Sequence, residues 1–338
     1  MANWEYKTLY IGGGTPTVLP TDDLCALVCD ARESFGLPSD AEVTVEANPG
    51  TVDKRALRDL STAGVNRLSL GVQSLDPQML RTLGRIHDAG QARQAVFDAR
   101  TAGIENLNLD LIFGLPGQSL ESWQEDLEGI LALQPDHLSL YALTVEESTP
   151  LAASIAAGTL PDPDPDLAAD MYEWAEERLA HDGWDHYEIS NWTRPGYACQ
   201  HNLIYWRNQP YLGLGAGAHS SFSAGCHSHA AWQRWANLPR PQDYIAALEN
   251  DQRPIDGEIE TLDRALERAE TMIMGLRLLH EGVSFERFRR RFGVSLKEAY
   301  GQQIQGLVAR GLLERLPDRL RLTEKGHLLG NQVFVEFL

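Results

Sequence analysis

Apolar runs that end in glycine or polar residues recur along the first half of the chain. Stretches with apolar residues at three- and four-residue spacing separate them, as expected of amphipathic helices between strands. The runs are 7–17, 43–49, 67–74, 107–118 and 137–144. The helical stretches are 22–34, 53–63, 88–102 and 119–133. Because the runs are nearly continuous in apolar character, they predict an α/β fold with a parallel sheet covered on both faces.

Four of these predicted strands have glycine or a polar residue at or near the carboxyl end. Glycines at 12–14 end the first run, and Glu46, Gln73 and Asp110 stand near the ends of the next three. In parallel α/β folds the carboxyl ends of the strands form the edge that binds ligands. One such polar residue is usually a core group with a hydrogen-bond partner or a helix cap. Their recurrence at one edge favours a binding site.

The order of these motifs resembles one family over nearly the whole chain, from Tyr10 to Leu338. The segments GGGTP, EANP, GVQS followed by LGRIHD, and NLDLIFGLPGQ are similar to the radical S-adenosylmethionine fold of the oxygen-independent coproporphyrinogen III oxidase group. The segments YEISNWTRPG, HNLIYW and LTEKGHLLGNQVFVEFL resemble its heme-chaperone branch, the HemW proteins. The resemblance implies a partial (βα)6 TIM-like barrel of the radical S-adenosylmethionine type that lacks its first βα unit.

The resemblance also implies an S-adenosylmethionine site at the strand ends. Its residues would be Gly13, Gly14, Thr15, Glu46, Gln73, Arg85, Asp110 and Thr144. The glycines and Thr15 would contact the methionine amino end. Glu46 and Asp110 would accept hydrogen bonds from the ribose, with Gln73 as a neutral donor and acceptor nearby. Thr144 would lie on the adenine side. Arg85 has the planar guanidinium that suits a carboxylate, and its alternative role is a surface ion pair with Asp88.

The cysteines depart from the family pattern. Members of the family hold a [4Fe–4S] cluster on a C-x3-C-x2-C motif that precedes the GGGTP turn. Here Cys25 and Cys29 follow that turn, Arg32 occupies the third position, and the other two cysteines are Cys199 and Cys226. Two thiols one turn apart indicate a helix face, whereas a cluster needs several converging thiolates. We therefore expect no cluster ligation by this chain. Either the first βα unit is truncated, which the opening Met-Ala-Asn-Trp-Glu favours, or this is a variant without radical chemistry.

A second group of candidate residues forms the motif HNxxYW. It contains His201, Tyr205 and Trp206, and in the family it distinguishes the heme chaperones from the oxidase. The resemblance implies that His201 is an axial ligand of heme iron, for which a neutral imidazole is suited. The two aromatic rings would pack on the porphyrin. The alternative for His201 is a hydrogen-bonded structural histidine. The nearby C-H-x-H at 226–229 lacks the second ligand pair of a zinc site and indicates a polar loop.

The pattern changes past residue 250 to short amphipathic helices. A small strand or wing follows in RLRLTEKG, and NQVFVEFL indicates a terminal helix. These elements predict a small, mainly helical, winged-helix-like domain over 251–338, after a barrel domain over 1–250. The predicted helices are 261–279, 284–291 and 295–310. The arginine-rich helix 284–291 is better explained as a solvated face than as a nucleic-acid surface, because acidic residues surround it.

Charge, the length of apolar runs and cysteine usage indicate which partners and which cell compartment suit the chain. The chain has 338 residues and a formal net charge of −19, which disfavours a nucleic-acid partner. No apolar run reaches the length that spans a bilayer. Four cysteines without a disulfide pattern are typical of a protein of the reducing cytoplasm.

Three functions remain open from the sequence. The first is a heme chaperone that passes heme to a hemoprotein, including membrane-associated ones. The second is an oxygen-independent coproporphyrinogen III oxidase, which needs the radical-generating cluster. The third is a barrel with only a structural or interaction role. The HNxxYW motif favours the first, and the missing cysteines disfavour the second. The sheet edge left by an absent first strand favours a homodimer or aggregation.

Overall fold

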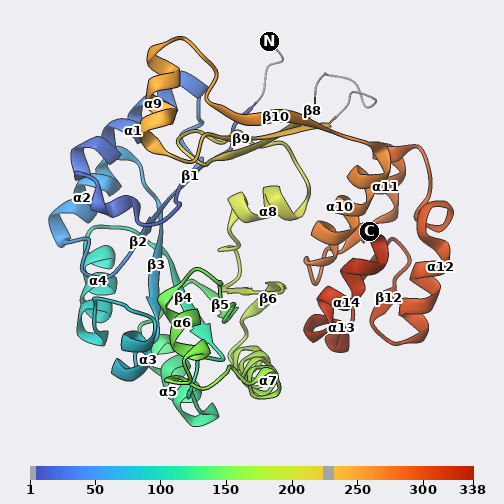
Figure 1. The fold of residues 1–338 in the computed structure, drawn as a ribbon, viewed down its shortest axis with the longest axis horizontal. Coiled ribbons are helices and arrows are strands. Elements are labelled where there is room, and N and C mark those ends of the chain that lie inside the picture. The colour runs from blue at the N-terminus through green and yellow to red at the C-terminus, as the bar shows by residue number, and fades with distance from the viewer. Residues whose placement is uncertain (1–4, 224–231) are drawn as a thin grey trace. The chain divides into compact units, whose positions relative to one another are not determined.

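The computed structural model describes residues 5–223 and 232–338. It divides into two compact units, with the division between His201 and Asn202 (Figure 1). The predicted polar loop at 226–229 lies outside the described residues. The predicted domain limits, 1–250 and 251–338, stay a prediction. The second unit contains a small antiparallel sheet as well as the helical region at the end of the chain.

The first unit is built on a seven-stranded sheet in the order β1-β2-β3-β4-β5-β7-β6. The first five strands pair in parallel and in chain order, as successive βα units do. They are β1 (Thr8–Ile11), β2 (Glu42–Ala47), β3 (Arg67–Gln73), β4 (Asn106–Phe113) and β5 (His137–Ala142). The hairpin of β6 (Asp185–Glu188) and β7 (Asn191–Thr193) adds antiparallel to β5. The predicted strands and the partial barrel are confirmed.

Helices with clear start signals connect these strands and confirm the four predicted helical stretches. The Asp53 side chain accepts from Ala56 N, and Asp88 and Gln91 form a capping box. The four are α1 (Thr21–Phe35), α2 (Lys54–Ala63), α4 (Ala89–Thr101) and α5 (Leu120–Leu131). The unit also contains the short helices η1 (Pro16–Val18), α3 (Pro77–Thr82) and α6 (Pro150–Ala156), and the longer α7 (Pro165–His181). Figure 1 shows α1, α2 and α4 following one side of β1 to β4.

The two faces of the parallel sheet differ in chemistry, which corrects the prediction of nearly continuous apolar strands. One face packs against the helices and is made of buried leucines at 68, 70, 107, 109, 138 and 140. The opposite face is polar, and many of its residues are buried: Thr44, Arg67, Ser69, Asn108, His137 and Ser139. Because side chains alternate along a strand, each strand places apolar and polar residues on different faces.

The second unit begins in α8 (Gln200–Trp206) and contains a separate antiparallel sheet of order β10-β9-β8. Its strands are β8 (His219–Ser223), β9 (Trp232–Asn237) and β10 (Ile255–Leu262), with α9 (Pro241–Glu249) between the last two. The sequence pattern did not predict this sheet, whose β10 is mostly exposed. Its apolar positions are too sparse to produce a strand signal.

The end of the chain confirms the winged-helix-like prediction. A three-stranded sheet of order β11-β13-β12 packs with three helices in the order helix, strand, helix, helix, strand, strand. The elements are α10 (Arg264–Leu276), β11 (Val283–Ser284), α11 (Phe285–Phe292), α12 (Leu296–Ala309), β12 (Leu313–Arg315) and β13 (Arg319–Leu322). The terminal helices are α13 (Glu324–Leu328), α14 (Gly330–Phe334) and η2 (Val335–Phe337). None of the helices in the described ranges is long and apolar enough to cross a membrane.

Candidate functional site

The glycine turn after β1 is held against the end of β2. Gly13 and Gly14 have φ values of 88° and 93°, in the region that favours glycine. No neighbouring atom lies within 4 Å of the position that a Cβ would occupy at either residue, so the turn is open to a ligand. Gly13 N donates to Glu46 Oε2 at 3.2 Å, and Asn48 Nδ2 donates to Thr15 Oγ1 at 2.6 Å.

The Glu46 carboxylate accepts hydrogen bonds both from this turn and from a tyrosine on β1. Its Oε1 accepts a hydrogen bond from the Tyr10 hydroxyl at 2.7 Å, while Oε2 accepts from Gly13 N. Burial, followed by the charge of Glu46, raises the pKa of Tyr10, so its hydroxyl stays protonated and donates. A carboxylate held in this way keeps further lone pairs that can accept from ligand hydroxyl or amino groups.

Asp110 is fixed by hydrogen bonds from neighbouring strands. Ser69 Oγ donates to its Oδ2 at 3.1 Å, and Asn108 Nδ2 donates to its Oδ1 at 2.7 Å. Burial raises the pKa of Asp110, hydrogen bonds from Ser139, Asn108 and Ser69 oppose that rise, and the charge of Glu46 adds to it. Because side chains alternate along a strand, Glu46 shares the polar face with Thr44, and Asp110 shares it with Asn108.

Gln73 ends β3 in an irregular conformation. Its φ is 68°, and the pairing of β3 with β4 shifts register between Gly71 and Gln73. A Cβ at Gly71 would lie 2.7 Å from both Asn48 Oδ1 and Gln73 Nε2. The glycine therefore gives room for two amide side chains at the strand end, and the bulge redirects Gln73.

Arg85 and Thr144 complete the predicted rim, with different degrees of burial. Burial lowers the pKa of Arg85, and the charge of Asp110 opposes that effect. Arg85 makes no ion pair with Asp88 in the part of the chain that the structure describes, so the alternative role is not realised. Thr144 is exposed, two residues beyond β5. His87 is buried beside the rim, where its Nε2 lies 3.0 Å from Val72 O.

His201 lies at the start of α8, fixed to β1 and β2. Its backbone N donates to Glu42 Oε1 and Gln200 N donates to Glu42 Oε2, each at 2.9 Å. Its ring stacks on Tyr10 with centroids 5.0 Å apart, and its Nδ1 lies 2.8 Å from Thr8 Oγ1. Burial, with the charge of Arg67, lowers the pKa of His201 to about 4. The imidazole is therefore neutral at physiological pH.

The other two residues of the motif belong to the second unit and pack there with neighbours of their own. The ring of Tyr205 meets that of Tyr211 edge-on at 4.7 Å. The Arg277 guanidinium lies 4.3 Å from the centroid of Trp206, over its ring. One face of Trp206 is thus occupied by a cation.

The described cysteines do not converge. Cys25 and Cys29 lie on α1, whereas Cys199 is buried and its Sγ donates to Glu42 Oε1 at 3.5 Å. No group of close metal-ligating side chains in the described ranges contains a cysteine. Burial, followed by the charges of nearby aspartates, raises the pKa of Cys25, which opposes the thiolate that a metal requires. These thiols do not fit an iron–sulfur cluster. Cys226 lies outside the described residues.

The sequence analysis missed a buried polar network beneath the rim. His137 Nδ1 lies 2.7 Å from Asn108 Oδ1, and His137 Nε2 lies 2.9 Å from the Tyr187 hydroxyl. Arg67 is 2% exposed at the start of β3. The signal that could have found these residues is the period of two in the strands, for example in RLSLGVQ and HLSLYA.

The arrangement suits a polar ligand with several functional groups. It combines two carboxyl groups, an amide, a guanidinium and an open glycine turn on the polar face of one sheet. The predicted residues of the first unit, apart from the exposed Thr144, meet around this edge. His201 joins them indirectly, through its stacking on Tyr10.

Family models match two parts of the chain. Residues 1–130 match the radical SAM superfamily, and residues 262–329 match the HemN C-terminal domain. A solved structure of coproporphyrinogen III oxidase (HemN) from Escherichia coli, a radical SAM enzyme, has a TM-score of 0.81 with 22% identity, covering 98% of this chain and 77% of that one. At this identity the likeness shows the fold.

Curated relatives match nearly the full chain. Heme chaperone HemW of Lactococcus lactis is 39% identical and covers 99% of this chain and 85% of its own length. The corresponding proteins of Mycobacterium tuberculosis and Escherichia coli are 37% and 36% identical, covering 96% and 99% of this chain and 79% and 84% of their own lengths.

Proposed function

Because this chain belongs to the HemW family of heme chaperones, we propose that it binds heme and passes it to heme-receiving proteins. The observation that carries the proposal is the 36–39% identity to the three HemW relatives, which extends over at least 96% of the chain. The alternative function, oxygen-independent coproporphyrinogen III oxidase, is supported only by the similarity in fold to the Escherichia coli HemN structure.

His201 is the proposed axial ligand of the heme iron. Its pKa of about 4 keeps the imidazole neutral, the form that binds iron. Thr8 engages Nδ1 and Tyr10 supports the ring face, so both neighbours would orient the imidazole. Second contacts of this kind orient histidine ligands in metal sites. Tyr205 and Trp206 are proposed to contact the porphyrin.

The rim of the first unit is the proposed S-adenosylmethionine site. Gly13, Gly14 and Thr15 would receive the methionine end, and Glu46 and Asp110 would accept from the ribose. Arg85 would pair with the carboxylate. Gln73 and Thr144 complete the set. The positive φ values of the glycines and the fixed carboxylate of Glu46 support this assignment. In the superfamily the cluster supplies radical chemistry, but the cysteines described in this chain do not fit it.

The proposed partners are heme and a protein that accepts it, including membrane-associated acceptors. The proposed compartment is the cytoplasm. No disulfide forms among the three described cysteines, which suits a reducing environment. A net charge of −19 does not suit a nucleic-acid partner.

Titration of heme into the purified protein tests the proposal. We expect the wild type to shift the heme absorbance band, and His201→Gln to weaken binding by at least about tenfold, because glutamine retains a polar group near Thr8 but lacks the imidazole ligand. His181→Gln is the matched control, since His181 has 84% of its side chain exposed on α7.

Circular dichroism of each variant confirms that it is folded. Unchanged heme absorbance with the wild type would refute heme binding. Equal affinities for the wild type and His201→Gln would remove His201 as the ligand while leaving heme binding intact.

A further inference from the structure

A small pocket in the second unit is rich in arginine. It has a volume of about 80 Å³ and lies between the end of α8, α10 and α11. Its charged lining residues are Arg207, Arg287, Arg291 and Glu281. The lining thus has three guanidinium groups and one carboxylate; two of the arginines pair with Glu281, and Arg291 pairs with Glu267, which is not a lining residue. This excess of positive charge stands out in a chain with a net charge of −19.

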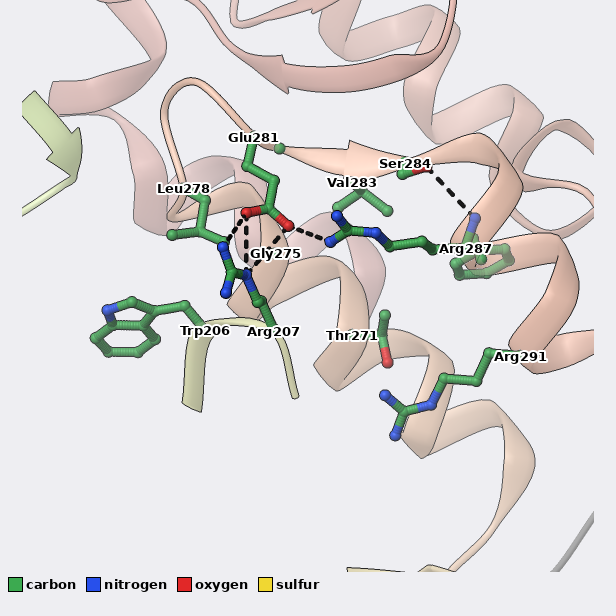
Figure 2. A pocket seen from close by; sticks show the side chains of 12 residues that line it. Trp206, Arg207, Thr271, Gly275, Leu278, Glu281, Val283, Ser284, Arg287 and Arg291 are labelled. Carbon is green, nitrogen blue, oxygen red and sulfur yellow. Dashed lines mark hydrogen bonds and ion pairs between the residues drawn. The ribbon is translucent and has the colours of Figure 1, made fainter. Parts of the chain in front are cut away.

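Glu281 is shared between two of these arginines. Arg207 donates to Glu281 Oε2 from Nε at 3.0 Å and from Nη2 at 2.8 Å, and Arg287 Nη1 contacts Glu281 Oε1. Figure 2 shows both guanidinium groups directed at this carboxylate from different elements. Burial by itself raises the pKa of Glu281, but hydrogen bonds and charges from Arg207 and Arg287 outweigh it and lower the pKa. One resident charge thus serves two arginines.

Arg291, another lining residue, has a buried donor without a partner in the part of the chain that the structure describes. Its Nε donates to Glu267 Oε1 at 3.0 Å and its Nη1 donates to Asn208 O at 2.7 Å. Its Nη2 is buried and has no hydrogen-bond partner among the described residues. The indole Nε1 of Trp206, another lining residue, is also a buried donor without a partner there. Buried donors without acceptors are costly and normally have a water or an ion beside them.

The balance of donors and acceptors decides which ligand fits. Three guanidinium groups line the pocket and share two carboxylates, so a cation is disfavoured, and an apolar group would leave the buried N–H groups unsatisfied. An oxyanion brings only acceptors, carries the complementary charge, and is the group that planar guanidinium forks recognise. The volume of about 80 Å³ is small, which limits the occupant to a single such group.

We propose that this pocket is an oxyanion site that takes one carboxylate or phosphate group. Arg287 and Arg291 are its main donors, and Glu281 is the resident charge that holds Arg207 and Arg287 in place. The group could come from a free anion such as inorganic phosphate. It could also be a propionate carboxylate of a tetrapyrrole, and this second source rests on the proposed function.

Thermal unfolding with and without inorganic phosphate, at constant ionic strength, tests the site. In Glu281→Gln two guanidinium groups lose their counter-charge, so we expect a lower Tm that phosphate raises at least about twice as much as in wild type. Glu336→Gln is the matched control, because Glu336 pairs with Arg310 at 3.0 Å outside the pocket. An equal phosphate effect in Glu281→Gln and Glu336→Gln overturns the proposal.

A second pair of variants keeps the test valid if Glu281→Gln does not fold. The Arg287 side chain is 60% exposed, so Arg287→Gln should fold. We expect it to lose most of the wild-type response to phosphate. Arg310→Gln, the control on the same unit, should retain that response. Retention by both variants overturns the proposal.

Metal-free protoporphyrin and its dimethyl ester distinguish the two sources. If the wild type prefers the free acid by about tenfold or more and Arg287→Gln removes that preference, the tetrapyrrole carboxylate is the occupant. Equal binding of acid and ester, together with a phosphate response, supports a free anion. The phosphate measurements contain no heme, so their outcome is independent of the proposed heme function.

Discussion

At the scale of single residues, His201 is fixed by contacts with three neighbouring side chains. Glu42 accepts from its backbone N, Thr8 lies 2.8 Å from Nδ1, and Tyr10 stacks on the ring. The Tyr10 hydroxyl in turn donates to Glu46 at the rim. The proposed heme ligand and the proposed S-adenosylmethionine residue therefore contact the same tyrosine. Both readings of His201, structural and ligating, are compatible with this arrangement.

The stability of the protein should depend on pH through His201. Its pKa in the folded protein is about 4, against an ordinary value of 6.5. Between these values the unfolded chain binds a proton at this residue and the folded chain does not, so stability falls as pH drops. Between pH 7 and 5.5 we expect a loss of about 1 kcal/mol from this residue alone.

Urea unfolding of the wild type and His201→Gln at both pH values measures this contribution. The buried His87 and His137, whose pKa values are also lowered, titrate in both proteins and cancel in the difference. The wild type should lose about 1 kcal/mol more than His201→Gln on acidification. An equal loss in the two proteins would mean that His201 is not desolvated as the structure has it.

At the scale of elements, the carboxyl ends of parallel strands bring the rim residues together. The loop after β1, the end of β2, the bulge of β3 and the interior of β4 supply Gly13, Glu46, Gln73 and Asp110. Arg85 follows α3 and is near enough to Asp110 for their charges to interact. Each element contributes one or two groups, so no single segment could form the site.

Arg85 should matter for the binding of S-adenosylmethionine. Arg85→Gln removes the only arginine among the proposed rim residues, so we expect an affinity at least about tenfold weaker because one charge-assisted interaction with the carboxylate is lost. Isothermal titration calorimetry measures the affinity. Arg81→Gln, a change at an exposed arginine on α3, is the control and should bind like the wild type. If the wild type gives no binding heat or if both variants bind equally, the proposed site or the role of Arg85 is wrong.

At the scale of the whole molecule, the residues that we propose for binding are distributed over two units. The first unit carries the rim and His201, and the second carries Tyr205, Trp206 and the arginine-rich pocket. The division falls inside α8, so the HNxxYW motif contributes residues to both units. The net charge of −19 belongs to the whole chain, and α11 of the winged-helix-like region is itself rich in arginine.

We expect the whole molecule to self-associate through the edge of its large sheet. β1 is the edge strand of the seven-stranded sheet, and an unpaired strand edge is a template for pairing with another chain. We expect the protein to form dimers or larger species as its concentration rises, measured by sedimentation velocity. A monomer at every concentration up to the millimolar range would contradict this expectation.

The sequence predicted the elements better than their faces. The strands, four connecting helices and the winged-helix-like order follow from local periodicity and from capping residues such as Asp53 and Asp88. The antiparallel sheet of β8 to β10 has no such signal. The polar network of Asn108, His137 and Tyr187 was missed because the alternation within each strand was taken for continuous apolar character.

By itself the sequence determined the family, the order of the parallel strands with their connecting helices, and the lack of a C-x3-C-x2-C motif within these 338 residues, because these depend on residues close together in the chain. Only the tertiary structure decided what those residues contact. It placed the neutral His201 on Tyr10, 193 residues from its partner Thr8, and brought Arg207 to Glu281 and Arg287. Burial and pairing between distant segments set pKa values and leave donors unsatisfied, and neither effect can be read from local pattern.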